Sequence, residues 1–146
     1  MSTEVRASYT DSFAHAFDAK GRITVPAEWR QPTFEASLFI LRSSDRCLKV
    51  YPASWLGRLQ EQVSLLKTAD PMRKGVEDLA TTAQSATFDT QGRIMIKEKL
   101  REGAGLKKEA MLVGRLDHFQ IWDKAAWHKK SIAAMTVEEA LSAIGL

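Results

Sequence analysis

Apolar and polar residues alternate over several short stretches of the chain, and this period of two is typical of β-strands with one buried face. Residues 22–25 are one example, with polar side chains at 22 and 24 and apolar ones at 23 and 25. Turn-forming residues such as Gly21 and Pro26 interrupt the pattern. The stretches assigned to strands are residues 13–18, 22–25, 38–41 and 47–51, then a run ending at Asp89, and residues 93–96, 110–113 and 118–122.

A spacing of three to four residues between apolar positions indicates amphipathic helices elsewhere. We expect Ser54 to cap one helix and Asp70-Pro71 to begin another. Their apolar faces would carry Leu56, Leu59, Val63 and Leu66, and then Met72, Val76, Leu79 and Ala83. Shorter helices are expected at 27–30, after the strand at 93–96 with an end at about residue 103, and at 125–134. Residues 136–139 have the sequence of a capping box, which begins a helix.

The chain contains an internal repeat. Residues 17–25 read FDAKGRITV and residues 88–96 read FDTQGRIMI, an offset of 71 positions. The same offset continues beyond these segments and pairs Arg30 with Arg101, Leu41 with Leu112, Leu48 with Phe119, Val50 with Ile121, and Tyr51 with Trp122. Chance is a poor explanation for so long a match. We infer two copies of one unit, at about 15–55 and 86–127, linked by the two longer helices.

Each copy places an arginine directly after a tight turn, at Arg22 and Arg93. Asp18 and Asp89 can bond the turn backbone, and Gly21 and Gly92 can adopt positive φ. Arginine offers a planar fork of donors that suits phosphate or guanine. Because each aspartate precedes its arginine by four residues, the pair could equally brace the turn. The spacing alone leaves bracing and ligand contact open.

Composition and charge narrow the function only slightly. The chain has 146 residues, 45% hydrophobic and 27% charged, which indicates a globular protein of one domain or two small halves. The net charge of +3 is a weak sign of nucleic-acid binding, although residues 89–108 carry six cationic against three acidic side chains. With no apolar run long enough to span a bilayer and no plan of a signal peptide, we expect a cytoplasmic protein.

Catalytic and metal-binding chemistry find no support in the pattern. Cys47 is the single cysteine, which excludes an internal disulfide and a cysteine-cluster zinc site. His15, His118 and His128 lie on different segments without ligand spacing, and Cys47 falls in an expected strand, where a buried thiol is the simpler interpretation. No glycine-rich phosphate loop or hydrolase motif is present. We therefore expect no enzyme, no metal and no cofactor.

The two D-x-x-G-R segments, at 18–22 and 89–93, resemble the MraZ family of bacterial transcriptional regulators. Ile-x-Val-Pro at 23–26, Tyr51-Pro52 followed by Trp55, and Ile121-Trp122 followed by Trp127 are similar as well. The resemblance covers about residues 9–130. It implies an α+β fold in which two tandem AbrB-like swapped-hairpin β units form an intrachain pseudo-dimer. The implied boundaries are 9–57 and 85–128 for the units, with a linking helical segment at 58–84 and a C-terminal one at 129–146.

The resemblance also implies a function and a partner. MraZ proteins bind tandem DNA repeats upstream of the division and cell-wall gene cluster, and they assemble into closed rings. Carried over by position, Arg22 and Arg93 are the expected DNA contacts, while Asp18, Gly21, Asp89 and Gly92 shape the turns. We add three candidate contacts beside them, Lys20, Gln91 and Lys97. The expected location is the cytoplasm, in association with the nucleoid.

Two departures from the family pattern distinguish the copies. Lys97 stands where the second motif usually has proline, and Gln91 stands where the first motif has Lys20, so the copies could contact DNA unequally. The alternative function is an antitoxin-type module that also binds a protein, for which tryptophans at 29, 55, 122 and 127 are candidate anchors if they are not simply packed. A single-strand binder would need exposed strand aromatics, whereas Phe17 and Phe88 are expected to be buried.

Overall fold

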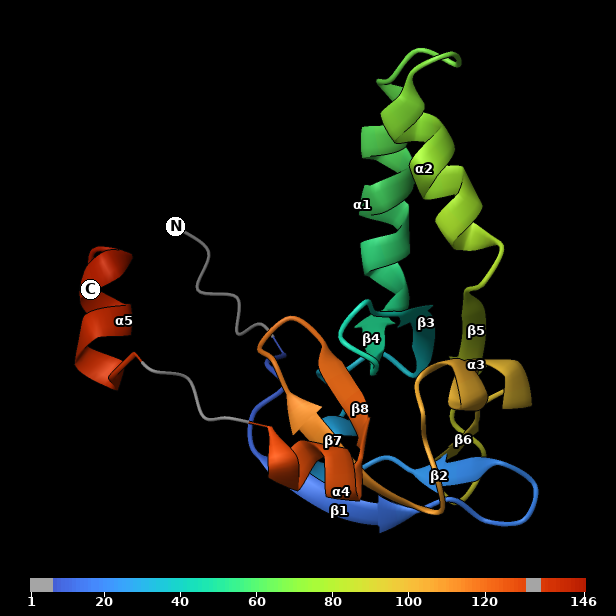
Figure 1. Cartoon of the computed structure of the whole chain (residues 1–146), viewed down its shortest axis with the longest axis vertical. Coiled ribbons are helices and arrows are strands. Elements are labelled where there is room, and N and C mark those ends of the chain that lie inside the picture. The colour runs from blue at the N-terminus through green and yellow to red at the C-terminus, as the bar shows by residue number, and fades with distance from the viewer. Residues whose placement is uncertain (1–6, 131–134) are drawn as a thin grey trace.

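The computed structural model describes residues 7–130 and 135–146 (Figure 1). Its strands are β1 (Ser12–Ala16), β2 (Arg22–Thr24), β3 (Ser37–Arg42), β4 (Leu48–Pro52), β5 (Gln84–Thr87), β6 (Arg93–Met95), β7 (Glu109–Gly114) and β8 (Phe119–Asp123). Its helices are the 3-10 turn η1 (Ala27–Trp29) and α1 (Ala53–Ser64), α2 (Pro71–Ala80), α3 (Glu98–Gly103), α4 (Lys124–Lys129) and α5 (Val137–Ala143). The expected α+β class is confirmed.

Six strands form one antiparallel sheet in the order β1-β7-β8-β4-β3-β5. Each half of the chain contributes a hairpin, β3–β4 or β7–β8, and the two hairpins meet along β4 and β8. The edge strands are exchanged between the halves, because β1 pairs with β7 and β5 pairs with β3. The remaining strands, β2 and β6, form a separate two-stranded sheet.

One hydrophobic core joins residues from both halves. Ile23 and Ile94, which face each other across the small sheet, are each 1% exposed. Trp29 is 2% exposed and lies among aromatic rings, with its centroid 5.3 Å from that of Phe13 and 4.9 Å from that of Phe119. Burial of such side chains is the main source of stability in a chain of this size. The two halves are therefore packed as one body.

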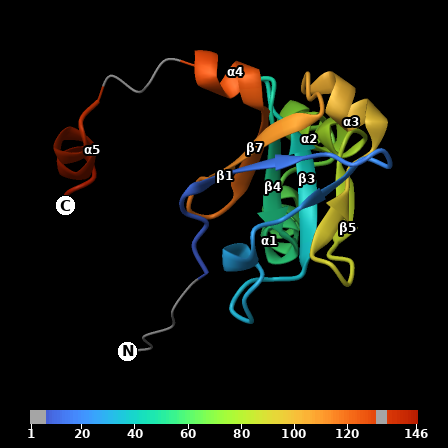
Figure 2. The ribbon, with the colours of Figure 1, turned by 90° about the horizontal axis from the view of Figure 1, so that it is seen from below.

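Helices α1 and α2 form a hairpin that projects from the sheet, and they are seen nearly end on behind β3 and β4 in Figure 2. Asp70 caps α2 as expected, accepting a hydrogen bond from the backbone of Met72 at 2.8 Å. Two predictions were wrong. Ser54 does not cap α1, because the helix begins at Ala53 and the Ser54 backbone N–H donates to Glu35 at 2.9 Å. The helices are also shorter than predicted, because α1 ends at Ser64 and α2 at Ala80, before Leu66 and Ala83.

The shorter helices agree with expectation in part. The capping box at Thr136 is present and begins α5, and α3 ends at Gly103 as predicted. The segment after Pro26 makes only one 3-10 turn. Helix α4 ends at Lys129, before the predicted end at 134. Residues 131–134 of that prediction lie outside the described chain. None of the helices in the described ranges is long and apolar enough to cross a membrane.

Candidate nucleic-acid interface

The first turn is held together by one carboxylate. Asp18 Oδ1 accepts hydrogen bonds from the backbone N–H groups of Lys20 at 3.0 Å and Arg22 at 2.8 Å. Its other oxygen, Oδ2, accepts from Nε of Arg22 at 2.6 Å. Gly21 adopts a φ of +79°, which allows the chain to reverse within these few residues. The turn is rigid because its backbone and its arginine share the same acceptor.

The second turn reproduces this arrangement nearly bond for bond. Asp89 Oδ1 accepts from the backbones of Gln91 at 2.8 Å and Arg93 at 2.9 Å, and Oδ2 accepts from Arg93 Nε at 2.8 Å. Gly92 has a φ of +75°. The D-x-x-G-R spacing thus encodes one local structure twice.

The hydrogen bonds to these carboxylates favour their charged form. The backbone N–H of Arg22 is the largest cause that holds the pKa of Asp18 below its ordinary value, with further contributions from the Arg22 side chain and the Lys20 backbone. The backbone N–H of Arg93 lowers the pKa of Asp89 in the same way. Both aspartates are therefore ionised at neutral pH and keep their arginines in place.

Pairing of β2 with β6 brings the two turns side by side. Beyond each strand, a backbone N–H donates to the glycine carbonyl of the opposite turn, at 3.0 Å in both cases. Arg93 Nη1 also lies 3.8 Å from Asp18 Oδ2, so one carboxylate faces both arginines. Two signatures 71 positions apart in sequence thus form a single cluster.

Arg30 and Arg101, the arginines that the repeat aligns with each other, lie against the two turns. Each donates from Nε to the carbonyl five residues earlier, Arg30 at 2.7 Å and Arg101 at 2.9 Å. Each then extends to the turn of the other half: a Cβ on Gly21 would lie 2.8 Å from Arg101 Nη2, and a Cβ on Gly92 would lie 2.6 Å from Arg30 Nε. The glycines are thus needed for space as well as for positive φ.

The bracing and contact interpretations of Arg22 and Arg93 are compatible in this geometry. Bracing uses Nε, whereas the outer guanidinium nitrogens of Arg22 make no hydrogen bond to any described residue. The side chains are 32% and 25% exposed. An arginine held by Nε presents its remaining donors in a fixed orientation, which lowers the entropic cost of binding a phosphate or a base edge.

The other predicted contacts lie differently. Lys20 and Gln91 are exposed at equivalent positions of the two turns. Lys97 is exposed at the start of α3, and its backbone N–H donates to the buried carboxamide of Gln84 at 2.9 Å. Proline at 97, as in the pattern that the resemblance implies, would lack that donor. No ion pair joins the Lys97 ammonium to the turns in the described part of the chain.

The residues considered for other chemistry are placed as structural groups. Cys47 is fully buried, and burial raises the pKa of its thiol, so the nucleophilic thiolate is disfavoured. Within residues 7–130 and 135–146 no three metal-ligating side chains gather. Trp29 and Trp122 are buried, Trp55 and Trp127 are half-buried, and Phe17 is buried as expected, while Phe88 is half-buried against the core.

Two lysines beside the first turn could not be predicted from the sequence. Lys107 and Lys108 belong to the second half and follow the second turn along the chain. In the fold, the backbone N–H of Phe17 donates to the Lys108 carbonyl at 2.8 Å, which places both lysines beside Asp18. The basic character of residues 89–108 was visible in the sequence, but the strand exchange that moves its end to the first turn was not.

The fold and the cluster define a class: an α+β protein whose two similar halves present paired, braced arginine turns. The family model described as "MraZ protein, putative antitoxin-like" matches the chain twice, at residues 9–74 and 79–142. The chain belongs to the MraZ family.

Curated relatives agree with this assignment. The chain is 38% identical over 116 residues to a protein of Thermomicrobium roseum named "Transcriptional regulator MraZ", covering 79% of this chain and 81% of the relative. Proteins of the same name from Corynebacterium jeikeium and Pediococcus pentosaceus are 37% and 35% identical, over 80% and 90% of this chain and 81% and 87% of theirs.

Proposed function

We propose that this protein is a non-enzymatic transcriptional regulator that binds double-stranded DNA, at tandem repeats upstream of the division and cell-wall gene cluster. The names of its relatives support regulation of transcription. The observation that carries DNA binding is the pair of adjacent turns, in which Arg22 and Arg93 are braced through Nε with further donors free to bind. Such a regulator would act in the cytoplasm, on the nucleoid.

In this proposal the arginines combine phosphate positioning with limited base readout. The aspartates and glycines set the turns, and Arg30 and Arg101 keep them in position. Lys20, Gln91 and Lys97 would extend the contact surface. The mechanism is electrostatic in large part, so each neutralised phosphate should add about −0.9 to the slope of log affinity against log salt.

We also infer that the halves constitute two AbrB-like units in a swapped-hairpin pseudo-dimer, with the boundaries given above. The exchanged edge strands and the symmetric order of the large sheet support this interpretation. So do the reciprocal bonds between the turns. A single chain would then offer the two related contact surfaces that most DNA-binding proteins obtain by dimerising.

Self-association into a ring is part of the proposal. Leu65, Met72 and Leu79 are 79%, 72% and 37% exposed on the projecting hairpin, and such surfaces mark protein contacts. Several chains on one ring would engage successive repeats and gain avidity of about 10²–10⁴-fold. Light scattering on the eluted full-length protein should give a mass of several chains, and a monomer would contradict the ring.

The function is tested by fluorescence anisotropy on a duplex from upstream of the protein's own coding region, with a scrambled duplex as reference. We expect specific binding with a steep salt slope, abolished by Arg22→Ala/Arg93→Ala. The matched control is Arg58→Ala/Lys67→Ala, which removes two exposed positive charges from the helical hairpin. Circular dichroism would verify that both variants are folded.

Other outcomes identify other functions. Equal affinity for both duplexes would indicate a nonspecific nucleoid protein. If no DNA binds although the protein is folded, the antitoxin-type module becomes the better interpretation. The observation that favours that alternative is the exposure of Val137 and Leu141 on α5 and of Ile144 directly after it.

A further inference from the structure

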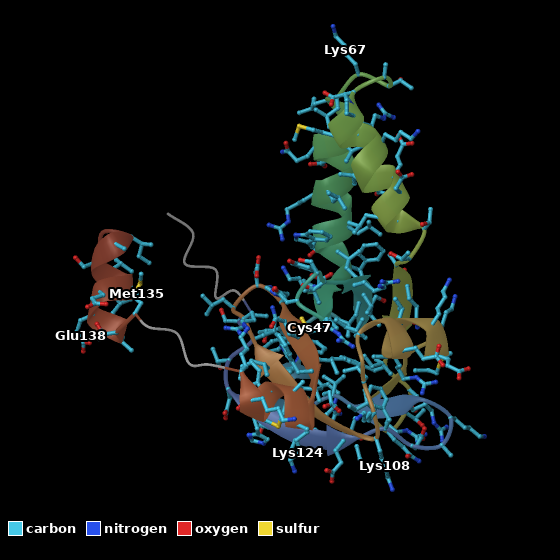
Figure 3. All side chains as sticks on the ribbon, viewed as in Figure 1. Cys47, Lys67, Lys108, Lys124, Met135 and Glu138 are labelled. Carbon is cyan, nitrogen blue, oxygen red and sulfur yellow. The ribbon has the colours of Figure 1, made fainter. Side chains whose placement is uncertain are left out.

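We propose that Lys107 and Lys108 form a phosphate-binding extension of the first turn alone, so that each chain lies on a DNA duplex with a fixed polarity. The inference rests on the proposed DNA binding and adds to it which end of the molecule binds more phosphates. It begins from the loop between α3 and β7, which the second half of the chain places against the first turn (Figure 3).

The loop is held firmly enough to act as part of a binding surface. The backbone N–H of Leu106 donates to the Arg101 carbonyl at 2.8 Å, and the Leu106 side chain packs against the core. The Lys108 carbonyl accepts from Phe17, the residue directly before Asp18. With its backbone fixed on both sides, the loop directs two exposed lysines to solvent beside the turn.

The lysines connect two neighbouring grooves of the surface. One groove is lined by Asp18, Ala19 and Arg101 together with Lys107 and Lys108. The next shares both lysines and continues along α4, where Lys124 and His128 line it. A basic strip therefore runs from the first turn along this end of the sheet. A DNA duplex carries one negative charge per ≈ 1.7 Å of helix axis, so its sugar–phosphate backbone is a ligand of complementary charge.

The acidic groups in the strip are outnumbered by its cationic ones. Asp18 is paired with Arg22. Asp123 is 9% exposed and accepts from the backbone N–H of Ala126 at 3.1 Å as the cap of α4, a bond that leaves its charge in place. Glu109 is the exposed carboxylate that remains along the two grooves in the described chain. The lining thus has four cationic side chains, Arg101, Lys107, Lys108 and Lys124, against these three carboxylates, of which Asp18 already has a partner.

Among the residues that the structure describes, the segment that flanks the second turn carries no lysine. Its flanking contact is the backbone N–H of Phe88 donating to Ala36 at 3.3 Å, and Ala36 and Ser37 occupy the positions that correspond to the two lysines. The nearby Glu35 is engaged by Ser54. Together with Lys20 opposite Gln91, this gives the first turn three cationic side chains that the second turn lacks.

This asymmetry has a consequence for the DNA site. A protein with two equivalent contact surfaces favours a palindromic site, because DNA symmetry mirrors protein symmetry. Unequal phosphate contacts at the two turns would make one orientation on each repeat stronger than the reverse. Fixed polarity suits repeats that all point in the same direction.

The first experiment compares Lys107→Gln/Lys108→Gln with the control Lys67→Gln/Lys74→Gln, which removes the same charge from the far hairpin. Anisotropy on the repeat duplex should show roughly tenfold weaker binding for the first variant and a salt slope smaller by about 1.8. The control should keep the wild-type slope, provided that light scattering gives it the wild-type mass, since its substitutions lie on the hairpin proposed for self-association. Equal salt slopes for the two lysine variants would overturn the inference even if Arg22→Ala/Arg93→Ala abolishes binding. If Arg22→Ala/Arg93→Ala binds as tightly as the wild type, the proposed function itself is rejected.

The second experiment reads the polarity directly. Iron chelate is attached in turn to Ala19→Cys and Thr90→Cys, equivalent exposed positions of the two turns, and Cys47 is too deeply buried to be labelled. The chelate at residue 19 should cleave the DNA on one side of every repeat, and the chelate at residue 90 should cleave it on the opposite side. In a protein that also carries Lys107→Gln/Lys108→Gln, the chelate at either position should cleave the DNA on both sides. Cleavage on both sides by the protein with its lysines intact would overturn the fixed polarity.

Discussion

The two turns have the same internal geometry and different surroundings. Asp18 and Asp89 each accept two backbone hydrogen bonds and one from an arginine Nε, with lengths that differ by at most 0.2 Å between equivalent bonds. Around the first turn lie lysines from the other half, and around the second lie alanine and serine. The comparison teaches that a short motif specifies its own bonds, whereas charge around it depends on how distant segments are brought together.

The largest effect on the free energy of unfolding is expected in the core, at the equivalent positions Trp29 and Leu100 of the two halves. Trp29→Ala should cost about 3–5 kcal/mol of unfolding free energy, and Leu100→Ala should cost less than Trp29→Ala, within the range of about 2–5 kcal/mol for such truncations. The tryptophan packs among aromatic rings, and its Nε1–H donates to the Thr10 carbonyl at 3.1 Å. Urea unfolding measures both, with the exposed Leu65→Ala as the control. A larger cost at Leu100 would reverse the comparison.

The turn glycines come next. Gly21→Ala and Gly92→Ala should each cost about 1–3 kcal/mol, because positive φ strains alanine and the new methyl group meets an arginine. The effect should be larger at Gly92, where the approach is closer. Thermal and urea unfolding provide the measurement. Gly75→Ala on α2 meets nothing within 4 Å and should instead stabilise the protein. Indifference of both turns to alanine would contradict the packing described here.

A smaller effect distinguishes the starts of η1 and α3. The first half has Phe13 and Pro26 where the second has Gln84 and Lys97. Lys97→Pro should cost about 1 kcal/mol, because Gln84 loses a donor while the φ of −60° at 97 already suits proline. Gln84→Phe/Lys97→Pro should recover part of that loss by copying the first half. A double-mutant cycle in urea gives the coupling, and strict additivity would contradict the paired substitution.

The smallest effect expected is on acid stability. Because the fold lowers the pKa of both aspartates, their contribution is complete above the ordinary value of about 3.9 and is lost as the pH falls through the folded pKa. Asp18→Asn and Asp89→Asn should each flatten the decline of the urea midpoint as the pH falls below about 4. Asp18→Asn should have the larger effect, since Asp18 also faces Arg93. Unchanged profiles would mean that the turn bonds do not favour the ionised form.

Much of the local structure could be predicted from the sequence because it depends on neighbours along the chain. The alternation of apolar residues predicted the strands, and Asp70-Pro71 and Thr136 predicted their helix starts. Ser54 was wrong because its expected role as a cap was replaced by a hydrogen bond with Glu35, nineteen positions away. The 72% exposure of Met72 could not be predicted, because helical spacing predicts an apolar face and does not state whether anything covers it.

The sequence by itself determined the two braced turns, because bonds across two to four residues need only the right side chains at the right spacing. Only the tertiary structure decided which half supports which turn. Exchange of β1 and β5 between the hairpins carries Arg101, Lys107 and Lys108 to the first turn and Arg30 to the second. The exchange occurs because the apolar faces of the strands in the two halves are buried together in one core. This depends on the whole chain and cannot be predicted from any short segment of it.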